Sequence, residues 1–409
     1  MRILVQKFGG SSLATPELRQ QVLQHILQAH DKGKKVVVVV SAMGRKGDSF
    51  ATDTLLDFFS QVVANPPVRE RDLVLSCGEV IAAAVMAAEI IQAGHAAVAF
   101  TGWQAGVITE EVFGQAEIIR IKKERILKQL QEGKIVVVAG FQGVTENGEI
   151  TTLGRGGSDT SAVAIAAALE AEQVEIYSDV AAVMTADPRL VPEAKPIRNI
   201  GYQEVLQMAR EGAKVIHPRA VDIALQYNLP LVLKKTGMPD QGTLVTHQKL
   251  IDGKSLMTKA KIVTGITHVT DLVQVTVPQA DNNQVEEILK QLSAAGISID
   301  LISFSPQDKM FTVDGSECGQ VKQILQALGF AAQIKKGVAK VTVVGFGMRG
   351  VPGVMSRIVT ALNRVQVPIL QTADSHLNIS CLIPEKDVAS AVRSLHQEFG
   401  LEEVSVKLL

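Results

Sequence analysis

A lysine and two adjacent glycines follow the first hydrophobic segment of the chain. The segment Lys7-Phe8-Gly9-Gly10-Ser11-Ser12 comes directly after the candidate strand Ile3–Val5 and before a helical pattern. Adjacent glycines let backbone N–H groups approach a phosphate closely, and the lysine adds positive charge. No Gly-x-x-x-x-Gly-Lys-Ser/Thr sequence occurs, so this phosphate site would not be a P-loop. The alternative is an ordinary strand-to-helix turn, in which glycine pairs are common.

A second glycine-rich cluster contains an arginine. In the stretch 151–161, Gly154, Gly156 and Gly157 surround Arg155, and an alanine-rich helical pattern follows. An arginine at a glycine-rich helix start can grip a carboxylate or a phosphate with both arms of its guanidinium, assisted by Ser158 and backbone N–H groups. The alternative is a plain N-cap at Ser158 or Asp159 beside a solvated arginine, which leaves the three glycines unexplained.

Short β-branched segments alternate with helical patterns up to about Thr246, which predicts a mainly parallel sheet between two helical layers. In such sheets ligands collect at the carboxyl ends of the strands. The predicted strands are Ile3–Val5, Val36–Val40, Ala96–Phe100, Ile135–Ala139, Val174–Tyr177 and Pro230–Leu233. The predicted helices are Glu17–His30, Leu73–Ala93, Lys123–Glu132, Asp159–Ala171 and Pro218–Tyr227.

The remainder of the chain contains an internal repeat. A polar linker near Asp252–Lys261 precedes two similar halves, each with the order βαββαβ of a ferredoxin-like module. The first half reads Val273–Val277, Gln284–Ala294, Ile297–Ile302, Met310–Val313, Gly319–Leu328 and Ala331–Lys335. The second reads Val341–Val344, Val354–Leu362, Pro368–Thr372, Asn378–Ile383, Val388–Phe399 and Val404–Leu408. We therefore expect three domains, at residues 1–246, 262–336 and 338–409.

The composition excludes several classes of protein. Apolar residues make up 46% of the chain and aromatic residues only 4%, so the core must consist mainly of Val, Ile, Leu and Ala. Lys and Arg (41) balance Asp and Glu (42), which argues against nucleic acid or an anionic membrane as a partner. Apolar runs such as Ile81–Ala88 reach about half of the ~20 residues that a membrane span needs. Three well-separated cysteines indicate incidental thiols in a reducing cytoplasm.

Several of these motifs, in this order, are similar to the successive signatures of aspartate kinases in the amino acid kinase superfamily. The similar segments are Lys7–Ser12, Val36–Gly44, Ser76–Glu79, Val138–Gly143, Thr152–Thr160, Tyr177–Val180 and Met184–Arg189. The two C-terminal repeats resemble the paired ACT domains of the same family. The resemblance implies a three-layer α/β/α kinase domain followed by two ACT modules. It also implies phosphorylation of the side-chain carboxylate of L-aspartate by ATP, the entry step to lysine, diaminopimelate, threonine and methionine synthesis.

The resemblance assigns roles residue by residue. It implies that Lys7 is catalytic and that Asp159 orients the catalytic lysines. It places ATP against Lys7, Phe8, Gly9, Gly10, Ser178, Asp179, Met184, Arg189 and Lys214, and aspartate against Thr52, Glu79, Arg155 and Ser158. Met184 stands where many relatives have tyrosine, and Ala182 where they have glycine. Mg²⁺ is implied by the nucleotide, and no protein metal ligands are assigned.

The chemistry agrees with these roles. A carboxylate is already ionised at pH 7, so it needs no general base to attack the γ-phosphorus. The barrier lies in bringing two anions together, which Lys7, Lys214, backbone N–H groups and Mg²⁺ would lower.

The sequence leaves other functions as alternatives. A sister kinase acting on glutamate, acetylglutamate or a nucleoside monophosphate is the nearest rival, and an inactive amino acid sensor is a rival of another class. The segment Gly345–Gly350 matches Gly-x-Gly-x-x-Gly, but too few residues follow it to complete a dinucleotide-binding fold. His217 and His376 have no nucleophile or metal ligand at a recognisable spacing, so cap or surface roles are expected.

Regulation is expected in the two repeats. Amino acid effectors of paired ACT domains are expected near Gly345–Gly353 with Gln371–Ser375 and near Pro278–Gln284 with Ser298–Ser305; the individual candidates are Gly347, Val354, Asp374 and Ser375. Phe304 stands where threonine-binding relatives have a glutamine, which argues against threonine alone. The stretch Thr372–His376 resembles relatives controlled by diaminopimelate, and Asp374 could pair with a second ammonium group, so diaminopimelate or lysine is the predicted inhibitor. We also expect a homo-oligomer formed through the ACT domains. In some relatives an internal start makes a separate regulatory subunit, and Met257 stands at a suitable position in the linker for such a start.

Overall fold

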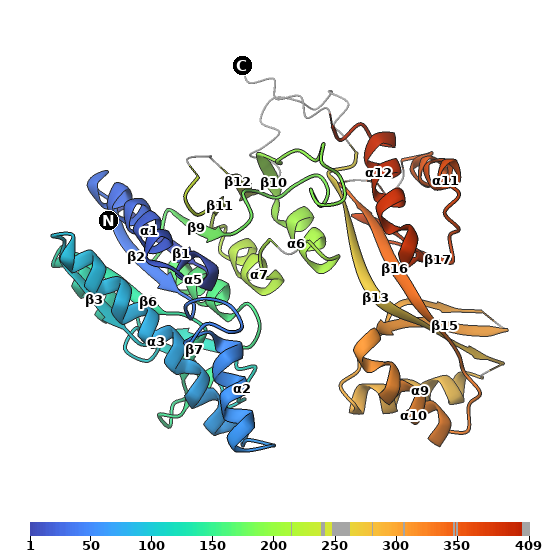
Figure 1. Cartoon of the computed structure of the whole chain (residues 1–409), viewed down its shortest axis with the longest axis horizontal. Coiled ribbons are helices and arrows are strands. Elements are labelled where there is room, and N and C mark those ends of the chain that lie inside the picture. The colour runs from blue at the N-terminus through green and yellow to red at the C-terminus, as the bar shows by residue number, and fades with distance from the viewer. Residues whose placement is uncertain are drawn as a thin grey trace. The chain divides into compact units, whose positions relative to one another are not determined.

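The computed structural model describes residues 1–213, 215–238, 242–247, 262–279, 281–305, 307–346, 348 and 351–402. These residues form two compact units (Figure 1). The first unit comprises residues 1–183, 196–209 and 214–255, and the second comprises 184–195, 210–213 and 256–409. The predicted linker, Met257, Lys214, Gly347 and the strand Val404–Leu408 fall on residues outside the described ones.

An eight-stranded sheet forms the centre of the first unit, in the order β10-β12-β11-β9-β1-β2-β6-β3. Its strands are β1 (Ile3–Phe8), β2 (Lys35–Val40), β3 (Ala97–Phe100), β6 (Ile135–Ala139), β9 (Gln173–Ser178), β10 (Asn199–Gly201), β11 (Leu231–Lys235) and β12 (Thr243–Thr246). Every neighbouring pair is parallel except β11 with β12. All six strands that the sequence predicted are present. The five consecutive valines of β2 are buried, as expected of a central parallel strand with both faces covered.

Helices cover both faces of this sheet. The helices of the first unit are α1 (Pro16–Asp31), α2 (Thr52–Val62), α3 (Val68–Gln92), α4 (Glu124–Gln131), α5 (Gly157–Ala168), α6 (Tyr202–Arg210) and α7 (Pro218–Gln226). Helices α1 and α3 pack on the face that carries Leu4 and Phe8 of β1. Lys7 points to the opposite face because side chains alternate along a strand, and α5 packs there. The predicted three-layer α/β/α domain is thus confirmed.

Helix α3 is long and apolar enough to cross a membrane by length and composition alone. Half of its most apolar window is buried inside the structure, and Ala82, Met86 and Ile90 pack against the central sheet. A core helix of a globular domain passes the same compositional test.

A small second sheet in the first unit was not predicted. It has the order β5-β4-β7-β8 and consists of β4 (Val107–Thr109), β5 (Ile118–Ile121), β7 (Gln142–Val144) and β8 (Ile150–Thr152). Strand β8 leads directly into the glycine-rich turn before α5. The sheet therefore fixes where that turn begins.

The second unit contains the predicted repeat. Its elements are β13 (Gly265–Pro278), α9 (Asn282–Ala294), β14 (Asp300–Phe304), β15 (Asp308–Asp314), α10 (Cys318–Ala327), β16 (Gln333–Val344), α11 (Val354–Arg364), β17 (Gln371–Asp374), β18 (Asn378–Pro384) and α12 (Val388–Glu398). The strands form one antiparallel sheet in the order β14-β15-β13-β16-β18-β17. Two strands predicted separately, Ala331–Lys335 and Val341–Val344, belong to the single strand β16. Gly337, with φ +69°, lies where the pairing of β16 with β13 changes register.

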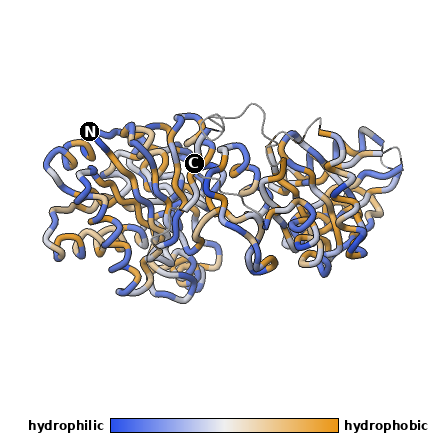
Figure 2. The backbone as a smooth tube through the Cα atoms, turned by 90° about the horizontal axis from the view of Figure 1, so that it is seen from above, coloured by the Kyte–Doolittle hydropathy of each residue, from blue (hydrophilic) through white to orange (hydrophobic). Residues whose placement is uncertain are grey.

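The two repeats bury part of each other. Helices α9 and α10 pack on β13 and β15, whereas α11 and α12 pack on β16, β18 and the start of β13. Leu272, Leu301, Val338 and Leu382, from both repeats, form a further cluster, and β14 contacts β17. Part of the sheet face that the helices leave open is therefore covered where the two repeats meet. Figure 2 shows hydrophobic stretches running through the interior of each unit.

The segment 184–195 belongs to the second unit although it lies between strands of the first unit in the sequence. Ala186, Val191 and Ala194 join the apolar core beneath α11 and α12. The carbonyl of Thr185 accepts from the Ile266 N–H, and its hydroxyl contacts His396 Nε2 at 2.9 Å. This segment is therefore part of the second unit's core.

Candidate active site

Lys7 lies near the carboxyl end of the central strand β1, between β2 and β9. Its side chain is buried, and its Nζ lies 2.6 Å from Oδ1 of Asp159 in the first turn of α5. Apart from this ion pair, Oδ1 has no hydrogen-bond partner among the described residues. The second oxygen, Oδ2, accepts the backbone N–H of His217 at 3.4 Å. Asp159 thus holds the lysine while retaining capacity for further contacts.

The loop after β1 lies against the loop after β2. A Cβ atom on Gly10 would lie 2.3 Å from the carbonyl oxygen of Ala42, so only glycine fits. The Gly44 N–H donates to the Gly10 carbonyl at 2.9 Å. Phe8, one of the predicted ATP-binding residues, is fully buried and stacks on Tyr177 with ring centroids 4.6 Å apart. Its side chain therefore belongs to the core.

The glycine-rich turn before α5 presents Arg155. Gly154 and Gly156 have φ of +72° and +69°, in the left-handed region that favours glycine. A Cβ on Gly156 would lie within 2.3 Å of His217, so this turn packs tightly against the start of α7. Arg155 itself is exposed, and the part of the chain that the structure describes gives its guanidinium no ion pair. It is available for an anionic ligand.

Helix α3 carries two buried carboxylates with different surroundings. Asp72 accepts hydrogen bonds from the N–H groups of Gly114 and Thr152 and from the Thr152 hydroxyl. Glu79 accepts only the Ala42 N–H, at 3.0 Å, and its Oε2 is buried without a partner among the described residues. Burial raises the pKa of Glu79 to about 8, partly offset by the Ala42 hydrogen bond. A positively charged group of a ligand could pair with the free carboxylate oxygen of Glu79 and favour its ionised form.

A cavity of about 790 Å³ in the first unit unites these groups. Six predicted residues line it: Lys7, Thr52, Glu79, Arg155, Ser158 and Asp159. They come from β1, the starts of α2 and α5, the middle of α3 and the glycine-rich turn, all at the carboxyl side of the central sheet. The two predicted catalytic residues and the four predicted aspartate-binding residues thus share one cavity.

The structure does not bring all predicted ATP-binding residues into this cavity. Ser178 ends β9, next to β1, and Asp179 forms an exposed ion pair with Arg45 at 2.9 Å. Met184 packs against the core of the second unit. Arg189 is 86% exposed and pairs with Asp187. Lys214 lies outside the described residues.

Among the other lining residues, those whose side chains bear most on ligand binding were not assigned to the site from the sequence: Arg71, Phe141, His217 and Arg219. Arg71 adds positive charge to the cavity wall, whereas the charge of Arg219 is partly balanced by Glu117, another lining residue, 3.8 Å away. Phe141 has φ +67°, a strained conformation for a bulky residue that is typical of functional sites. Its position within the motif Val138–Gly143 is the one sequence signal that could have assigned Phe141 to the site.

His217 was expected to have a cap or surface role. It is the N-cap of α7 through its backbone, but its ring lies at the cavity. Burial lowers the pKa of His217, while Asp159 acts in the opposite direction. Its Nδ1 is buried without a partner among the described residues. The lone histidine gave no motif from which this location could have been predicted.

The residues that line the cavity can hold Mg²⁺ only together with a nucleotide. The described residues include only one cluster of three potential metal ligands, His30, Asp31 and His95, and none of these lines the cavity. Mg²⁺ typically binds through one or two carboxylates together with substrate phosphates and water. Asp159, with its incompletely bonded Oδ1, is a suitable carboxylate. The residues therefore fit a magnesium ion that enters with the nucleotide.

The predicted effector residues lie in the second repeat. Val354 is buried at the first position of α11, and Asp374 ends β17. The Ser375 hydroxyl accepts from the N–H groups of Leu377 and Asn378 in the turn before β18. Gly345 leaves no room for a Cβ, which would lie 1.9 Å from the Ile262 carbonyl oxygen. Packing against Ile262 therefore explains why Gly345, the first glycine of the Gly-x-Gly-x-x-Gly match, is a glycine. It directly follows β16 of the antiparallel sheet.

Comparisons with known proteins agree with this architecture. The amino acid kinase family model matches residues 2–235, and an ACT domain model matches residues 341–399. Among solved structures, Escherichia coli aspartokinase III in complex with aspartate and ADP superimposes with a TM-score of 0.78 at 24% identity, covering 97% of this chain and 99% of that one. At this identity the match supports the fold alone. Aspartate kinase from Synechocystis is 37% identical, with a TM-score of 0.55, covering 97% of this chain and 69% of that one.

Curated relatives match over nearly the full length. Aspartokinase 1 of Bacillus subtilis is 46% identical, covering 98% of this chain and all of that protein. Aspartokinase of Geobacillus stearothermophilus is 42% identical, covering 98% of both chains. The chain therefore belongs to the amino acid kinase family and, within it, to the aspartokinases.

Proposed function

We propose that the 790 Å³ cavity transfers the γ-phosphoryl group of ATP to the side-chain carboxylate of L-aspartate, giving 4-phospho-L-aspartate and ADP. The observation that carries this assignment is the convergence of Lys7, Glu79 and Arg155 on one cavity. A lysine for the phosphoryl group, together with a buried carboxylate and an arginine that have no ion pair among the described residues, matches the charges of this reaction. The aspartokinases of Bacillus subtilis and Geobacillus stearothermophilus, at 46% and 42% identity, support this choice of reaction.

Aspartate would be held by its three charged groups. We assign its α-carboxylate to the Arg155 guanidinium, which offers two parallel donors. The α-ammonium would lie against Oε2 of Glu79, the buried oxygen without a partner. Ser158, at the start of α5, and Thr52, at the start of α2, would fix the remaining orientation.

Lys7 would stabilise the negative charge that develops on the transferring phosphoryl group. The ionised acceptor carboxylate needs no proton removed before it attacks. Asp159 keeps the Lys7 ammonium in place through their ion pair. Magnesium, when bound with the nucleotide, supplies charge neutralisation of the phosphates.

The remaining predicted ATP contacts stay proposals: Phe8 through its backbone, Gly9, Gly10, Ser178, Asp179, Met184, Arg189 and Lys214. Gly9 is close to the catalytic lysine, since a Cβ there would lie 3.7 Å from Lys7 Nζ. For residues 1–246, 262–336 and 338–409 we propose a kinase domain and two ACT modules. Gly337 falls inside β16, so the boundary between the modules lies within a shared strand.

ACT modules imply allosteric regulation, and we propose feedback inhibition by diaminopimelate or lysine at Gly347, Val354, Asp374 and Ser375. Escherichia coli aspartokinase III has been solved with lysine, which supports an amino acid effector. We also propose a cytoplasmic homo-oligomer assembled through the ACT modules. Strand β14 is at an edge of the described sheet with Ile302 and Phe304 about half exposed, and such edges favour pairing.

A substrate panel tests the proposed activity. ADP release would be measured with ATP and magnesium in the presence of aspartate, glutamate, N-acetylglutamate or no acceptor. We expect release above background with aspartate only. Equal or greater release with glutamate or N-acetylglutamate would assign the cavity to a sister kinase, and no release with any acceptor would favour an amino acid sensor.

A further inference from the structure

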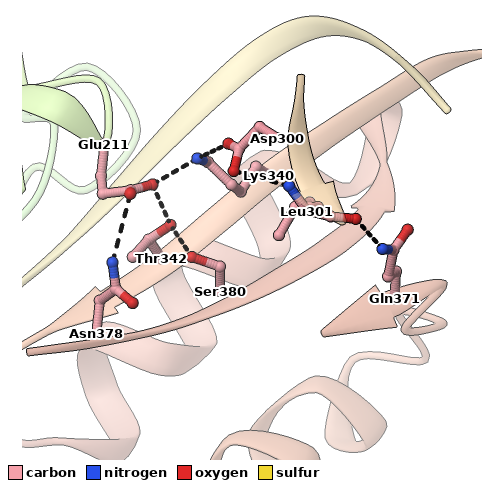
Figure 3. Close-up of polar contacts among 8 residues, drawn as sticks. All are labelled: Glu211, Asp300, Leu301, Lys340, Thr342, Gln371, Asn378 and Ser380. Atoms are coloured by element: carbon pink, nitrogen blue, oxygen red, sulfur yellow. Dashed lines mark hydrogen bonds and ion pairs between the residues drawn. The ribbon is translucent and has the colours of Figure 1, made fainter. Parts of the chain in front are cut away.

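A buried ion-pair network in the second unit has no part in the cavity described above (Figure 3). Glu211 immediately follows α6 and contacts Lys340 of β16, with Oε2 2.7 Å from Nζ. The side chains are only 11% and 7% exposed. Lys340 also pairs with Asp300 at the start of β14. Burial lowers the pKa of Lys340, but Glu211 and Asp300 outweigh burial and raise the pKa above its ordinary value.

Glu211 is well satisfied in this position. Its Oε2 accepts from the Thr342 hydroxyl at 3.1 Å, and its Oε1 accepts from Asn378 Nδ2 at 3.3 Å. The next residue, Gly212, has φ +103°, and a Cβ there would lie 2.2 Å from the His268 carbonyl oxygen. The backbone and the side chain of this segment are therefore both fixed to the sheet of the second unit.

The same segment leads directly to the active-site cavity. His217 follows Glu211 by six positions in the sequence and lines the cavity. Its N–H donates to Asp159, which pairs with Lys7. A short stretch of chain thus joins a fixed point in the sheet of the second unit to the partner of the catalytic lysine.

The other partner of Lys340 lies where the two repeats meet. Asp300 precedes Leu301, whose carbonyl accepts from the Gln371 side-chain amide at the start of β17 (Figure 3). Gln371 Oε1 in turn accepts from Gln274 of β13 at 2.9 Å. A ligand that moves β14 relative to β17 would change the distance between Asp300 and Lys340. The charge balance at Glu211 would change with it.

We propose that Glu211 is a positioning residue for the phosphoryl transfer and that Lys340, shared between Glu211 and Asp300, transmits effector binding to it. Lys340 fixes Glu211 to the sheet of the second unit, and the chain continues from there to His217, whose N–H donates to Asp159. The transmission rests on the proposed amino acid regulation, whereas the positioning of Asp159 does not.

Glu211→Gln in the full-length chain tests the positioning role, because it keeps the shape of the side chain and removes its charge. Without effector we expect kcat to fall at least about fivefold, as when a catalytic group is misplaced, with the KM of ATP and of aspartate changed less than twofold. Lys340→Arg retains a cation and should keep kcat near the unmodified value. If Glu211→Gln only lowers the unfolding temperature and leaves kcat unchanged, Glu211 is structural and the proposal is overturned.

Asp300→Asn tests the transmission. Inhibition curves would be measured with L-lysine and with meso-diaminopimelate separately. We expect unchanged kcat without effector and a half-inhibitory concentration shifted at least about fivefold, the lower end of typical coupling between sites. Glu286→Gln, which breaks the exposed Glu286–Lys290 pair on α9, is the matched control and should change neither. An unshifted curve for Asp300→Asn overturns the transmission. If the unmodified enzyme responds to neither amino acid, the assignment of the effector fails, while the kcat of Glu211→Gln still decides the positioning role.

Discussion

Two buried lysine–carboxylate pairs, one in each unit, have nearly the same burial and very different surroundings. Lys7 and Asp159 are 11% and 13% exposed, and Lys340 and Glu211 are 7% and 11% exposed. Glu211 has hydrogen-bond partners on both oxygens. Asp159 has Lys7 and one long hydrogen bond, and both residues face a cavity.

This difference in hydrogen bonding suggests a structural role for the Lys340–Glu211 pair and a ligand-binding role for the Lys7–Asp159 pair. A buried charge with all its partners is at a local energy minimum, and removing one partner is costly. A buried charge that lacks a partner destabilises the free protein, and a ligand that supplies the partner removes this destabilisation. Incomplete bonding among the described residues therefore supports the proposed catalytic role of Lys7 and Asp159. Glu79, whose Oε2 has no partner among the described residues, follows the same pattern.

The largest effect on stability is expected for Lys340→Met. It leaves the carboxylates of Glu211 and Asp300 without their cation, and breaking a buried pair in this way costs about 3–5 kcal/mol of unfolding free energy. Urea unfolding of the full chain would measure the loss. Lys7→Met, the matched change in the cavity, should cost clearly less, and equal losses would contradict the distinction between the two pairs.

Lys7→Ala should abolish most of the activity while preserving the fold. The transition state loses its charge stabilisation, so we expect kcat to fall by about a hundredfold or more. A coupled ADP assay measures the rate, and circular dichroism checks the fold. Near-normal kcat in a folded variant would remove Lys7 from the mechanism.

Arg155→Lys should separate the two substrates. Lysine keeps the positive charge but cannot donate two parallel hydrogen bonds, so the KM of aspartate should rise about tenfold while that of ATP changes little. Initial rates over a grid of both substrates give the two values. If the two KM values rise equally, Arg155 is not the aspartate clamp.

The smallest predicted effect is a pH dependence caused by Glu79. Its pKa is raised to about 8, so the carboxyl group of the free enzyme is mostly protonated at pH 7 and ionises as the pH rises. Only the ionised form attracts the ammonium of aspartate. The KM of aspartate should therefore fall roughly fivefold between pH 7 and pH 8, as the ionised fraction rises from about one-tenth to one-half.

Glu79→Gln is the control for this pH dependence. The variant should bind aspartate weakly at both pH values, with no fall in KM. A fall of the same size in the variant would assign the titration to another group.

Much of the fold could be predicted from the sequence because its strongest signals are local. The five valines of β2 and the periodic helices around them specify the central α/β/α domain. The four strands of the small sheet have only three or four residues each, too few for an alternating pattern to stand out. Gly337 made β16 look like two strands, because a glycine usually marks a break in a strand pattern.

The candidate site shows the same contrast between residues with a local sequence signal and residues without one. Lys7 and Arg155 stand in glycine-rich segments after predicted strands, and they do meet in one cavity. Arg71 and Arg219 lie on ordinary helical patterns, where arginine is usually solvated. The packing of the segment 184–195 into the second unit depends on contacts with residues more than sixty positions later, such as Ile266 and His396. No local pattern reports such contacts.

The threading of the chain between its units has a consequence for engineering. The second unit is built from three separate stretches of sequence, 184–195, 210–213 and 256–409. A regulatory region transplanted onto another kinase as the C-terminal stretch alone would lack Ala186, Val191 and Ala194 from its core and Glu211 from its ion-pair network. The exposed apolar surface would invite aggregation. Recombination of regulation and catalysis in this family is therefore expected to succeed only when the two short internal segments are exchanged together with the C-terminal modules.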